Sequence, residues 1–140
     1  MQIFIIGSPL ETAEILDKRR LNKQIIECKQ ICNALNGDGA WSNHPCVLQY
    51  KDHMAWLGHY HNCLMFYQRK EYLLADIESK FAMLYQPHWH TYEYFTQMKR
   101  RLYTKDKEYY AQWAELGESQ ENWYYVDGIW RKYINGKRIE

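Results

Sequence analysis

The densest group of side chains capable of chemistry lies between residues 17 and 27, where acids, bases and an amide recur at helical spacing. On a helix, Arg20 and Glu27 lie about 20° apart around the axis and roughly 10 Å apart along it. Lys23 and Gln24 fill the gap between them. Arg and Lys can hold phosphates, Gln can pair with a base edge, and Glu can act as a general base. A solvated face with an ordinary Lys–Glu pair explains the same pattern, and the pattern alone favours it.

A second candidate is the run Asn43-His44-Pro45, which follows a glycine-containing loop and Trp41. Proline suits the first position of a helix, so the run is typical of a helix cap. It also places an amide and an imidazole at a helix N-terminus, where backbone N–H groups attract anions. The residues alone leave both interpretations open.

Two His-x-His pairs raise the question of a metal site, at His59 with His61 and at His88 with His90. Positions i and i+2 of a helix point about 200° apart, so a helical pair does not chelate jointly. No HExxH pattern accompanies either pair. We therefore expect no metal, and a metal-assisted nuclease using His88 or His90 is the weakest alternative.

Basic residues alternate with aromatic rings toward the end of the chain, including Lys99, Arg100 and Arg131. Cations can hold phosphates and rings can stack on unpaired bases. Acidic residues nearly balance the basic ones in this part, so packing explains the rings equally well.

The elements that must position these residues are mainly helical. Residues 2–6 read as a short extended segment, and Asn36-Gly37 is a helix stop signal. Capping residues and periodicity predict helices at 9–16 and 18–35 (two helices or one bent helix), 45–69, 71–84, 90–103 and 106–116, with a loop at 37–44. Asp127-Gly128 and Asn135-Gly136, between runs with β-propensity, predict a small hairpin-like tail.

The apolar positions of the 18–35 segment recur at spacings of four and three, which predicts the core stripe Leu21, Ile25, Cys28, Cys32 and Leu35. The polar group from Arg20 to Glu27 then falls on the adjoining face.

The composition is that of an ordinary globular protein, with 46% apolar and 25% charged residues, which excludes a disordered chain. A length of 140 residues favours one compact domain over 1–140. A formal net charge of +1 does not indicate any class of binding partner, so a nucleic-acid site would need a local patch of basic residues. No run is long enough to span a membrane, and we expect no secretory signal, because the opening apolar stretch is short and no basic residue precedes it. We therefore expect a cytoplasmic protein whose four cysteines are reduced core thiols.

Several nucleotide and hydrolase motifs are missing from the sequence: GxxxxGK[ST], GxGxxG and GxSxG. Nucleotide triphosphate hydrolysis, a Rossmann cofactor and a serine hydrolase therefore have no support. We expect no nucleotide cofactor.

Three sets of residues resemble one family: the stretch Leu16-Asp17-Lys18-Arg19-Arg20-Leu21-Asn22-Lys23-Gln24, then Glu27 with Gln30-Ile31, and then Asn43-His44-Pro45. Together they resemble the pyrimidine-dimer DNA glycosylase/endonuclease V family, in particular its bacterial and phage members with RRLxKQxxE and NHP motifs. The later stretch HWHTYEYFTQMKRRLYTKDKEYYAQW is similar to the closing region of those members.

The resemblance implies a compact, mainly α single domain that binds double-stranded DNA as a monomer, without metal or other cofactor. It also implies a DNA glycosylase with AP lyase activity, in which the N-terminal amine attacks the sugar C1′ and a Glu moves protons. An α-amine titrates near pH 8, so part of it is neutral at pH 7 and nucleophilic.

Carried onto this chain, the resemblance makes Met1 the nucleophile and Glu27 the acid/base. It matches Arg19, Arg20 and Lys23 to phosphate-holding positions, and Asn43 and His44 to the members with the NHP motif. Together with Gln24, Lys99, Arg100 and Arg131, which were proposed above from their residue types, these are the predicted DNA-binding residues. Alignment of the helix on its arginines puts Arg20 where the family has its catalytic Glu. Glu27 is the nearest carboxylate on the same face.

Two hypotheses follow. The favoured one is a glycosylase acting on a damaged or modified pyrimidine in DNA. The other is a catalytically inactive relative that grips DNA through the same face.

Overall fold

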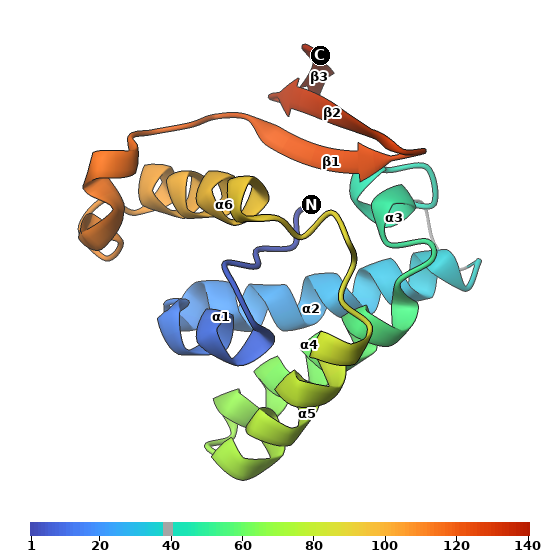
Figure 1. Cartoon of the computed structure of the whole chain (residues 1–140), viewed down its shortest axis with the longest axis vertical. Coiled ribbons are helices and arrows are strands. Elements are labelled where there is room, and N and C mark those ends of the chain that lie inside the picture. Colours follow the sequence, from blue (N-terminus) through green and yellow to red (C-terminus); the bar gives the residue numbers. More distant parts are fainter. Residues whose placement is uncertain (38–40) are drawn as a thin grey trace. The chain divides into compact units, whose positions relative to one another are not determined.

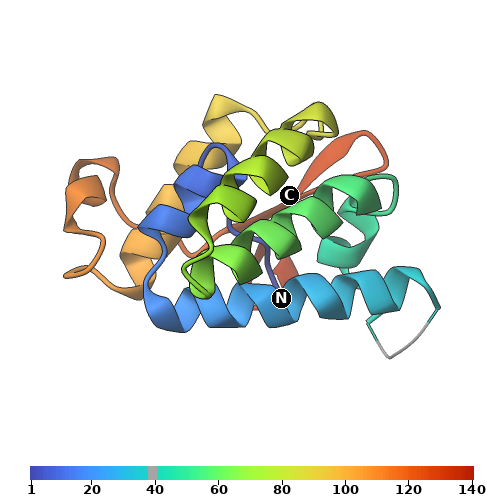
Figure 2. The same cartoon turned by 90° about the horizontal axis from the view of Figure 1, so that it is seen from below.

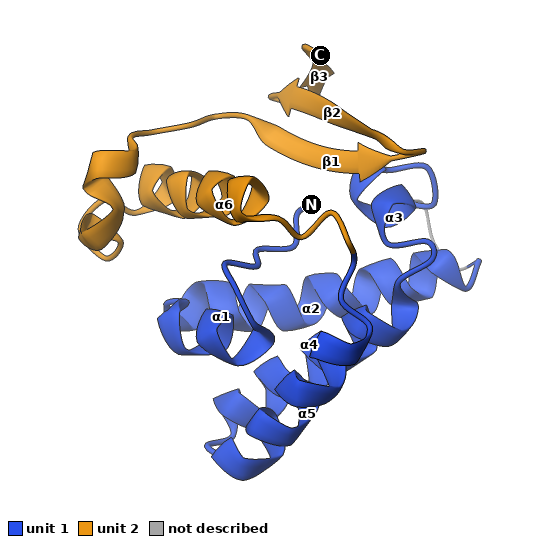
Figure 3. Ribbon diagram, viewed as in Figure 1, with its two compact units in different colours: residues 1–87 blue, residues 88–140 orange. Residues whose placement is uncertain are grey.

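The computed structural model describes residues 1–37 and 41–140. The chain is mainly α with a three-stranded antiparallel sheet near its end, as the sequence predicted (Figure 1). It divides into two compact units, residues 1–87 and 88–140, which Figure 3 colours separately. One domain over 1–140 stays a prediction.

In its described residues, the first unit contains helices and loops but no strand. Residues 1–5 form neither helix nor strand. The helices are α1 (Pro9–Ile15), α2 (Lys18–Leu35), α3 (Pro45–Gln49), α4 (Met54–Gln68) and α5 (Tyr72–Leu84). Of the two alternatives for residues 9–35, two separate helices is correct. The predicted loop at 37–44 lies partly outside the described residues.

The ends of α1 and α2 follow from their capping residues. Ser8 accepts from the Glu11 N–H at 3.1 Å, and the Glu11 carboxylate accepts from the Ser8 N–H at 3.2 Å, which is a complete capping box. Pro9 occupies the first helical position. Asp17 caps α2, which ends at Leu35, directly before the predicted stop at Asn36-Gly37.

The single helix predicted over 45–69 is wrong, because the backbone leaves helical geometry between α3 and α4. His53 has φ −130° and ψ 29°, outside the helical region. The break lets the fully buried rings of Tyr50 and Trp56 stack with centroids 5.5 Å apart. On one continuous helix, residues six apart lie about 9 Å apart along the axis and point about 120° away from each other. The stack therefore requires the break.

The core stripe predicted on α2 is only partly correct. Leu21 and Cys28 are buried, whereas Ile25, Cys32 and Leu35 are only half-buried. The buried face is rotated and includes two polar residues; its members are Leu21, Gln24, Glu27, Cys28, Ile31 and Ala34. The first residues of the chain bond to Gln24 and Glu27, which periodicity within one helix cannot reveal.

Helix α4 is the centre of the first unit. It packs against α1, α2 and α5, and Figure 2 shows it between α2 and α5. Trp56 and Tyr60 are fully buried and stack with centroids 4.9 Å apart. Such rings bury a large apolar area and fix how α4 meets its neighbours.

The second unit combines one helix with a sheet. Its elements are α6 (Tyr92–Lys105), the 3-10 helix η1 (Ala111–Leu116), β1 (Asn122–Val126), β2 (Ile129–Ile134) and β3 (Lys137–Arg138). The helix predicted over 106–116 is wrong in its first half. Asp106 is extended, with φ −151°, and its carboxylate accepts from the Tyr109 N–H in a turn. A short acidic side chain thus competes with the helix for backbone donors.

The strands are joined by the predicted turns. β1 pairs with β2 and β2 with β3, both antiparallel. Asp127 and Gly128 both have positive φ, as do Asn135 and Gly136. Two-residue hairpin turns of the type I′ class require this backbone, and Asn-Gly and Asp-Gly adopt it at low cost.

Within the described parts of the chain, no helix is both long and apolar enough to cross a membrane. The four thiols are free, and those of Cys28, Cys46 and Cys63 are buried.

Candidate active site

The start of the chain is fastened to α2 by one side-chain amide. Gln24 accepts a hydrogen bond from the Phe4 N–H and donates one to the Gln2 carbonyl, each at 2.9 Å. Only 2% of Gln24 is exposed. The Gln24 amide thus satisfies two buried backbone groups that would otherwise need hydrogen bonds from a neighbouring strand.

Glu27 lies one helical turn further along the same face. Its carboxylate accepts from the Gln24 amide at 2.9 Å and from the Gln2 backbone N–H. Burial raises the pKa of Glu27, and the N-terminal ammonium of Met1 and Lys23 oppose that rise. The terminal amine is therefore close enough to act on this carboxylate electrostatically.

The opposite side of the N-terminal stretch is held by α3 and α4. The Ile3 backbone N–H bonds to the Cys46 sulfur, and the Tyr60 hydroxyl donates to the Phe4 carbonyl. Burial raises the pKa of Cys46 to about 12, so the thiol stays protonated. The two contacts fix the stretch between α2 on one side and α3 and α4 on the other.

His44 is the N-cap residue of α3 and lies two residues before Cys46. Its Nδ1 accepts from the Cys46 backbone N–H at 3.1 Å. Burial lowers the pKa of His44, and the N-terminal ammonium lowers it further. The ring of Trp41 meets the imidazole edge-on, with centroids 5.9 Å apart. The imidazole is therefore neutral near pH 7 and close to the chain's amino end.

The amine of Met1, the carboxylate of Glu27 and the imidazole of His44 are thus brought into one neighbourhood. An amine can act as a nucleophile and a partly buried carboxylate can move its protons. No cofactor is required for that chemistry.

Some basic residues of α2 are exposed, and one is paired with an acidic residue. Arg19 and Lys23 are exposed. Arg20 pairs with Asp17 at 3.1 Å across the first turn, so its charge is partly neutralised within the helix. Gln24, predicted to contact DNA, is instead buried and bonded to the N-terminal stretch. Asn43 is exposed at the approach to α3.

The remaining predicted residues belong to the second unit, where they make local contacts. Arg100 donates to the Glu118 carbonyl at 3.0 Å, and Arg131 pairs loosely with Asp127 at 3.5 Å. The Lys99 ammonium lies 5.9 Å from the centre of the Trp113 ring.

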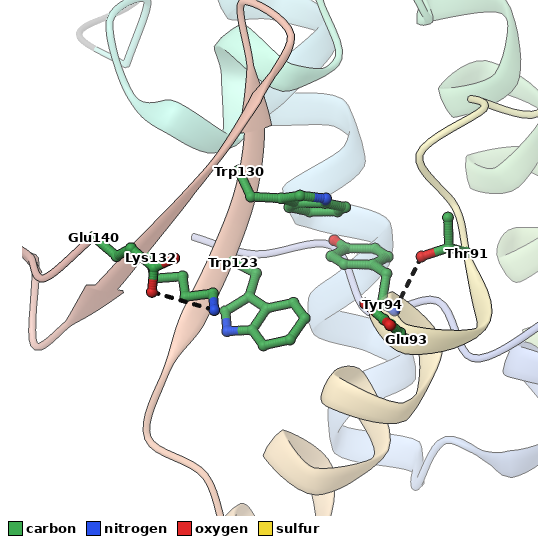
Figure 4. A pocket seen from close by; sticks show the side chains of 7 residues that line it. All are labelled: Thr91, Glu93, Tyr94, Trp123, Trp130, Lys132 and Glu140. Carbon is green, nitrogen blue, oxygen red and sulfur yellow. Dashed lines mark hydrogen bonds and ion pairs between the residues drawn. The ribbon is translucent and has the colours of Figure 1, made fainter.

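A pocket of ≈ 150 Å³ opens in the second unit between the start of α6 and the strands (Figure 4). Its walls include the rings of Tyr94, Trp123 and Trp130. The Lys132 ammonium lies 4.6 Å from the centre of the Trp123 ring and pairs with Glu140 at 3.3 Å. None of the residues predicted to be functional lines this pocket.

The histidines of the two His-x-His pairs contact other side chains. Among the described residues, no cluster of His, Cys, Asp and Glu could hold a metal ion. His59 instead pairs with Glu78 at 2.6 Å, and His90 stacks on Tyr94 with centroids 5.8 Å apart.

Sequence reasoning missed three residues of the site: Gln2, Cys46 and Tyr60. Their contacts join positions 22 to 56 residues apart, as with Gln24 to Gln2 and Tyr60 to Phe4. The spacing of residues along one helix does not predict contacts with a distant segment.

Comparison with known proteins adds one finding. A family model described as pyrimidine dimer DNA glycosylase matches residues 1–72, the part that contains Met1, Glu27, His44 and Tyr60. No curated protein and no solved structure matches the chain. The matched segment spans more than half of the 140 residues. The chain therefore belongs to the pyrimidine dimer DNA glycosylase family.

Proposed function

We propose that this protein is a DNA glycosylase that removes a dimerised or otherwise modified pyrimidine from double-stranded DNA, with an associated AP lyase activity. The nucleophile is the amine of Met1, and Glu27 moves the protons. The observation that carries the proposal is that the buried amide of Gln24 bonds both to the Gln2 carbonyl and to the Glu27 carboxylate, each at 2.9 Å, which holds the start of the chain beside this acid. Membership of the family supplies the substrate class.

The first half of the reaction is displacement at the sugar. The lone pair of the neutral amine forms a bond to C1′ while the glycosidic C1′–N bond breaks, and its electron pair leaves with the base. The base takes up a proton from solvent or from a site acid. The attached nitrogen, now an ammonium, gives one proton to the Glu27 carboxylate. Burial raises the pKa of Glu27, which makes this carboxylate a stronger base than an exposed one.

The second half opens the sugar ring. The nitrogen lone pair forms C1′=N while the C1′–O4′ bond breaks, and O4′ receives a proton from Glu27. The ionised carboxylate then stabilises the cationic Schiff base beside it. Loss of a C2′ proton and departure of the 3′ phosphate complete the lyase step.

DNA is held, in this proposal, by the exposed Arg19 and Lys23 of α2, with Arg20 completing the basic turn. Asn43 is exposed directly before α3, and its side-chain amide is a further candidate for a phosphate contact. Lys99, Arg100 and Arg131 are further candidates for phosphate contacts from the second unit. An exposed C1′ requires a kinked duplex or a flipped nucleotide, which costs a few kcal/mol.

The test is base release from a duplex containing one pyrimidine dimer, compared with the undamaged duplex. We expect release from the damaged duplex alone, and loss of release in Glu27→Gln. Salt-dependent binding of the damaged duplex without release would instead support the catalytically inactive DNA-binding relative. Chain cleavage that stops when a chelator is added would contradict both.

A further inference from the structure

We propose that the outward face of α5 is a self-association surface, through which two copies of this chain pair in an antiparallel, two-fold arrangement. Pairing through α5 does not depend on the proposed function, because none of the residues that it uses belongs to the candidate active site. The family resemblance implies a monomer instead, so the two expectations can be told apart by experiment.

Helix α5 lies at the edge of the first unit, where it packs against α4 and α1 (Figure 1). Its buried residues are Ala75, Ser79 and Ala82, which form one narrow stripe along the helix. The Ser79 hydroxyl accepts from the Leu10 backbone N–H at 3.0 Å. These small side chains bury little apolar area themselves. The packing of α5 within its unit therefore leaves its large side chains in solvent.

The large apolar side chains of α5 are the exposed ones, which is the reverse of an ordinary amphipathic helix. Between Tyr72 and Tyr85, eight of them are between 40% and 74% exposed. At about 200 Å² for a large side chain, they present on the order of 800 Å² to solvent. The largest apolar patch of a typical monomer is about 300–600 Å², and each partner of a standard interface contributes about 800 Å². The exposed area of α5 is thus what one side of a stable dimer needs.

Four of these residues form a seam that is symmetric about Ser79. Leu74, Ile77, Phe81 and Leu84 recur at spacings of three, four and three, the spacing by which two helices pack side by side. When a second α5 lies antiparallel with its Ser79 at the same level, each Ile77 faces the Phe81 of the other copy. Leu74 faces Leu84 in the same way. The same surface of both copies is then in contact, so the assembly closes as a dimer.

The charges beside the seam fit a second copy of the same helix. Asp76 and Lys80 lie on one side of the seam and pair at 2.8 Å within one chain. In the antiparallel pair, Lys80 of one copy lies about 3 Å along the axis from the level of Asp76 of the other copy. The two Lys–Asp pairs can therefore exchange partners across the two-fold axis. On the other side of the seam, Glu78 is already paired with His59 at 2.6 Å.

A nucleic acid or a membrane fits this face less well than a second copy does. The charged residues between 71 and 85 are Glu71, Asp76, Glu78 and Lys80, three acids and one base. Their net negative charge repels DNA phosphates and the anionic surface of a lipid bilayer. A second copy supplies both an apolar seam of the same length and the complementary charges.

Sedimentation velocity of the full chain at about 1 to 100 μM measures the association. We expect an equilibrium between monomer and dimer without larger species, because a two-fold interface closes. Ile77→Glu places a charge at the centre of the seam and should raise the dissociation constant at least about 10-fold. Ile26→Glu makes the same change at an exposed position of α2 and should leave the dissociation constant unchanged. Circular dichroism checks that both variants are folded.

A charge exchange tests the two-fold geometry without altering the seam. Asp76→Lys leaves only positive charge on its side of the seam, and Lys80→Asp leaves only negative charge there. Each variant alone should dimerise about 10-fold more weakly than wild type, because like charges then meet across the axis. An equimolar mixture of the two variants should regain most of the association as a heterodimer.

Several results overturn the proposed pairing. A monomer at every concentration does so, and so does a dimer that persists in Ile77→Glu, because its interface then lies elsewhere. Assemblies that keep growing with concentration exclude a closed two-fold contact. Equal association of the charge variants, alone and mixed, excludes the antiparallel register. If a monomeric wild type sediments with phosphatidylcholine vesicles and Ile77→Glu does not, the face binds a lipid surface instead. None of these measurements involves base release, so the proposed function is tested separately.

Discussion

The amide of Gln24 donates to the Glu27 carboxylate at 2.9 Å and, from the same nitrogen, to the Gln2 carbonyl at 2.9 Å. One buried side chain thus couples the position of the chain's first residues to the position of its buried acid. Chain termini are normally flexible, so the distance between a terminal amine and a carboxylate normally varies. Here the Gln24 side chain of α2 fixes it by bonding to two backbone groups of the stretch, the Phe4 N–H and the Gln2 carbonyl.

Removal of this amide should loosen the N-terminal stretch. Gln24→Ala leaves the Phe4 N–H and the Gln2 carbonyl without their partner, and we expect a loss of about 1–3 kcal/mol in the free energy of unfolding. Urea titration measures the loss, and amide hydrogen exchange at Phe4 should accelerate. Gln30→Ala, an exposed site on the same helix, is the control. Equal stability of the two variants would show that the stretch is held by other contacts.

The buried acid should weaken the fold at neutral pH. The pKa of Glu27 is raised in the folded state, above the value of 4.5 for a free Glu, so the folded protein binds that proton more tightly than the unfolded chain. The stability that Glu27 contributes is therefore fully present below that free value and declines as the pH rises through its folded-state pKa.

Glu27→Gln removes this dependence because its amide cannot ionise. We expect the variant to gain stability relative to wild type as the pH rises from about 4 to about 8, while base release and adduct formation are lost. Urea midpoints across that range measure the difference. If the stability of Glu27→Gln relative to wild type instead falls as the pH rises, the attraction of Glu27 to the N-terminal ammonium and Lys23 outweighs the cost of burying its charge.

The exposed basic residues of α2 should control the salt dependence of DNA binding. Each phosphate contact that is lost lowers the slope of log K against log salt by about 0.9. We expect this change in Arg19→Ala and in Lys23→Ala, measured by fluorescence anisotropy at several salt concentrations. Lys29→Ala removes an exposed charge from another side of α2 and should leave the slope nearly unchanged. If the salt slope is the same in all three variants, the DNA does not contact this face of α2.

The hydroxyl of Tyr60 should matter for the same stretch. Tyr60→Phe keeps the stacked ring but leaves the Phe4 carbonyl without its donor, which costs about 1–3 kcal/mol. Thermal and urea unfolding measure the change. Tyr85→Phe, at a half-exposed ring of the same unit, should be within about 0.5 kcal/mol of wild type. If both variants match the wild type, the Phe4 carbonyl has another donor.

The sequence predicted what depends on local chemistry. The Ser8–Glu11 box, the Asp17 cap and the two hairpin turns are each specified by residues within four positions of one another. The assignment of Met1 and Glu27 to one site came from a family resemblance, and their catalytic roles stay a prediction.

What the sequence could not supply depends on contacts between distant segments. The break before α4 serves the stacking of Tyr50 on Trp56. Gln24 was expected to face a ligand, because a polar residue at helical spacing looks the same whether it meets DNA or the backbone of Gln2. The basic residues of the second unit were predicted to contact DNA, but Arg100 donates a hydrogen bond to the Glu118 carbonyl.

The most direct test locates the covalent bond between protein and DNA. The protein is incubated with an abasic duplex, reduced with borohydride and digested, and the adduct is mapped by mass spectrometry. The adduct is expected on the α-amine of Met1, and it should be absent after that amine is acetylated. An adduct on a lysine side chain, or base release that persists in the acetylated protein, would contradict the role of Met1 as the nucleophile beside Glu27.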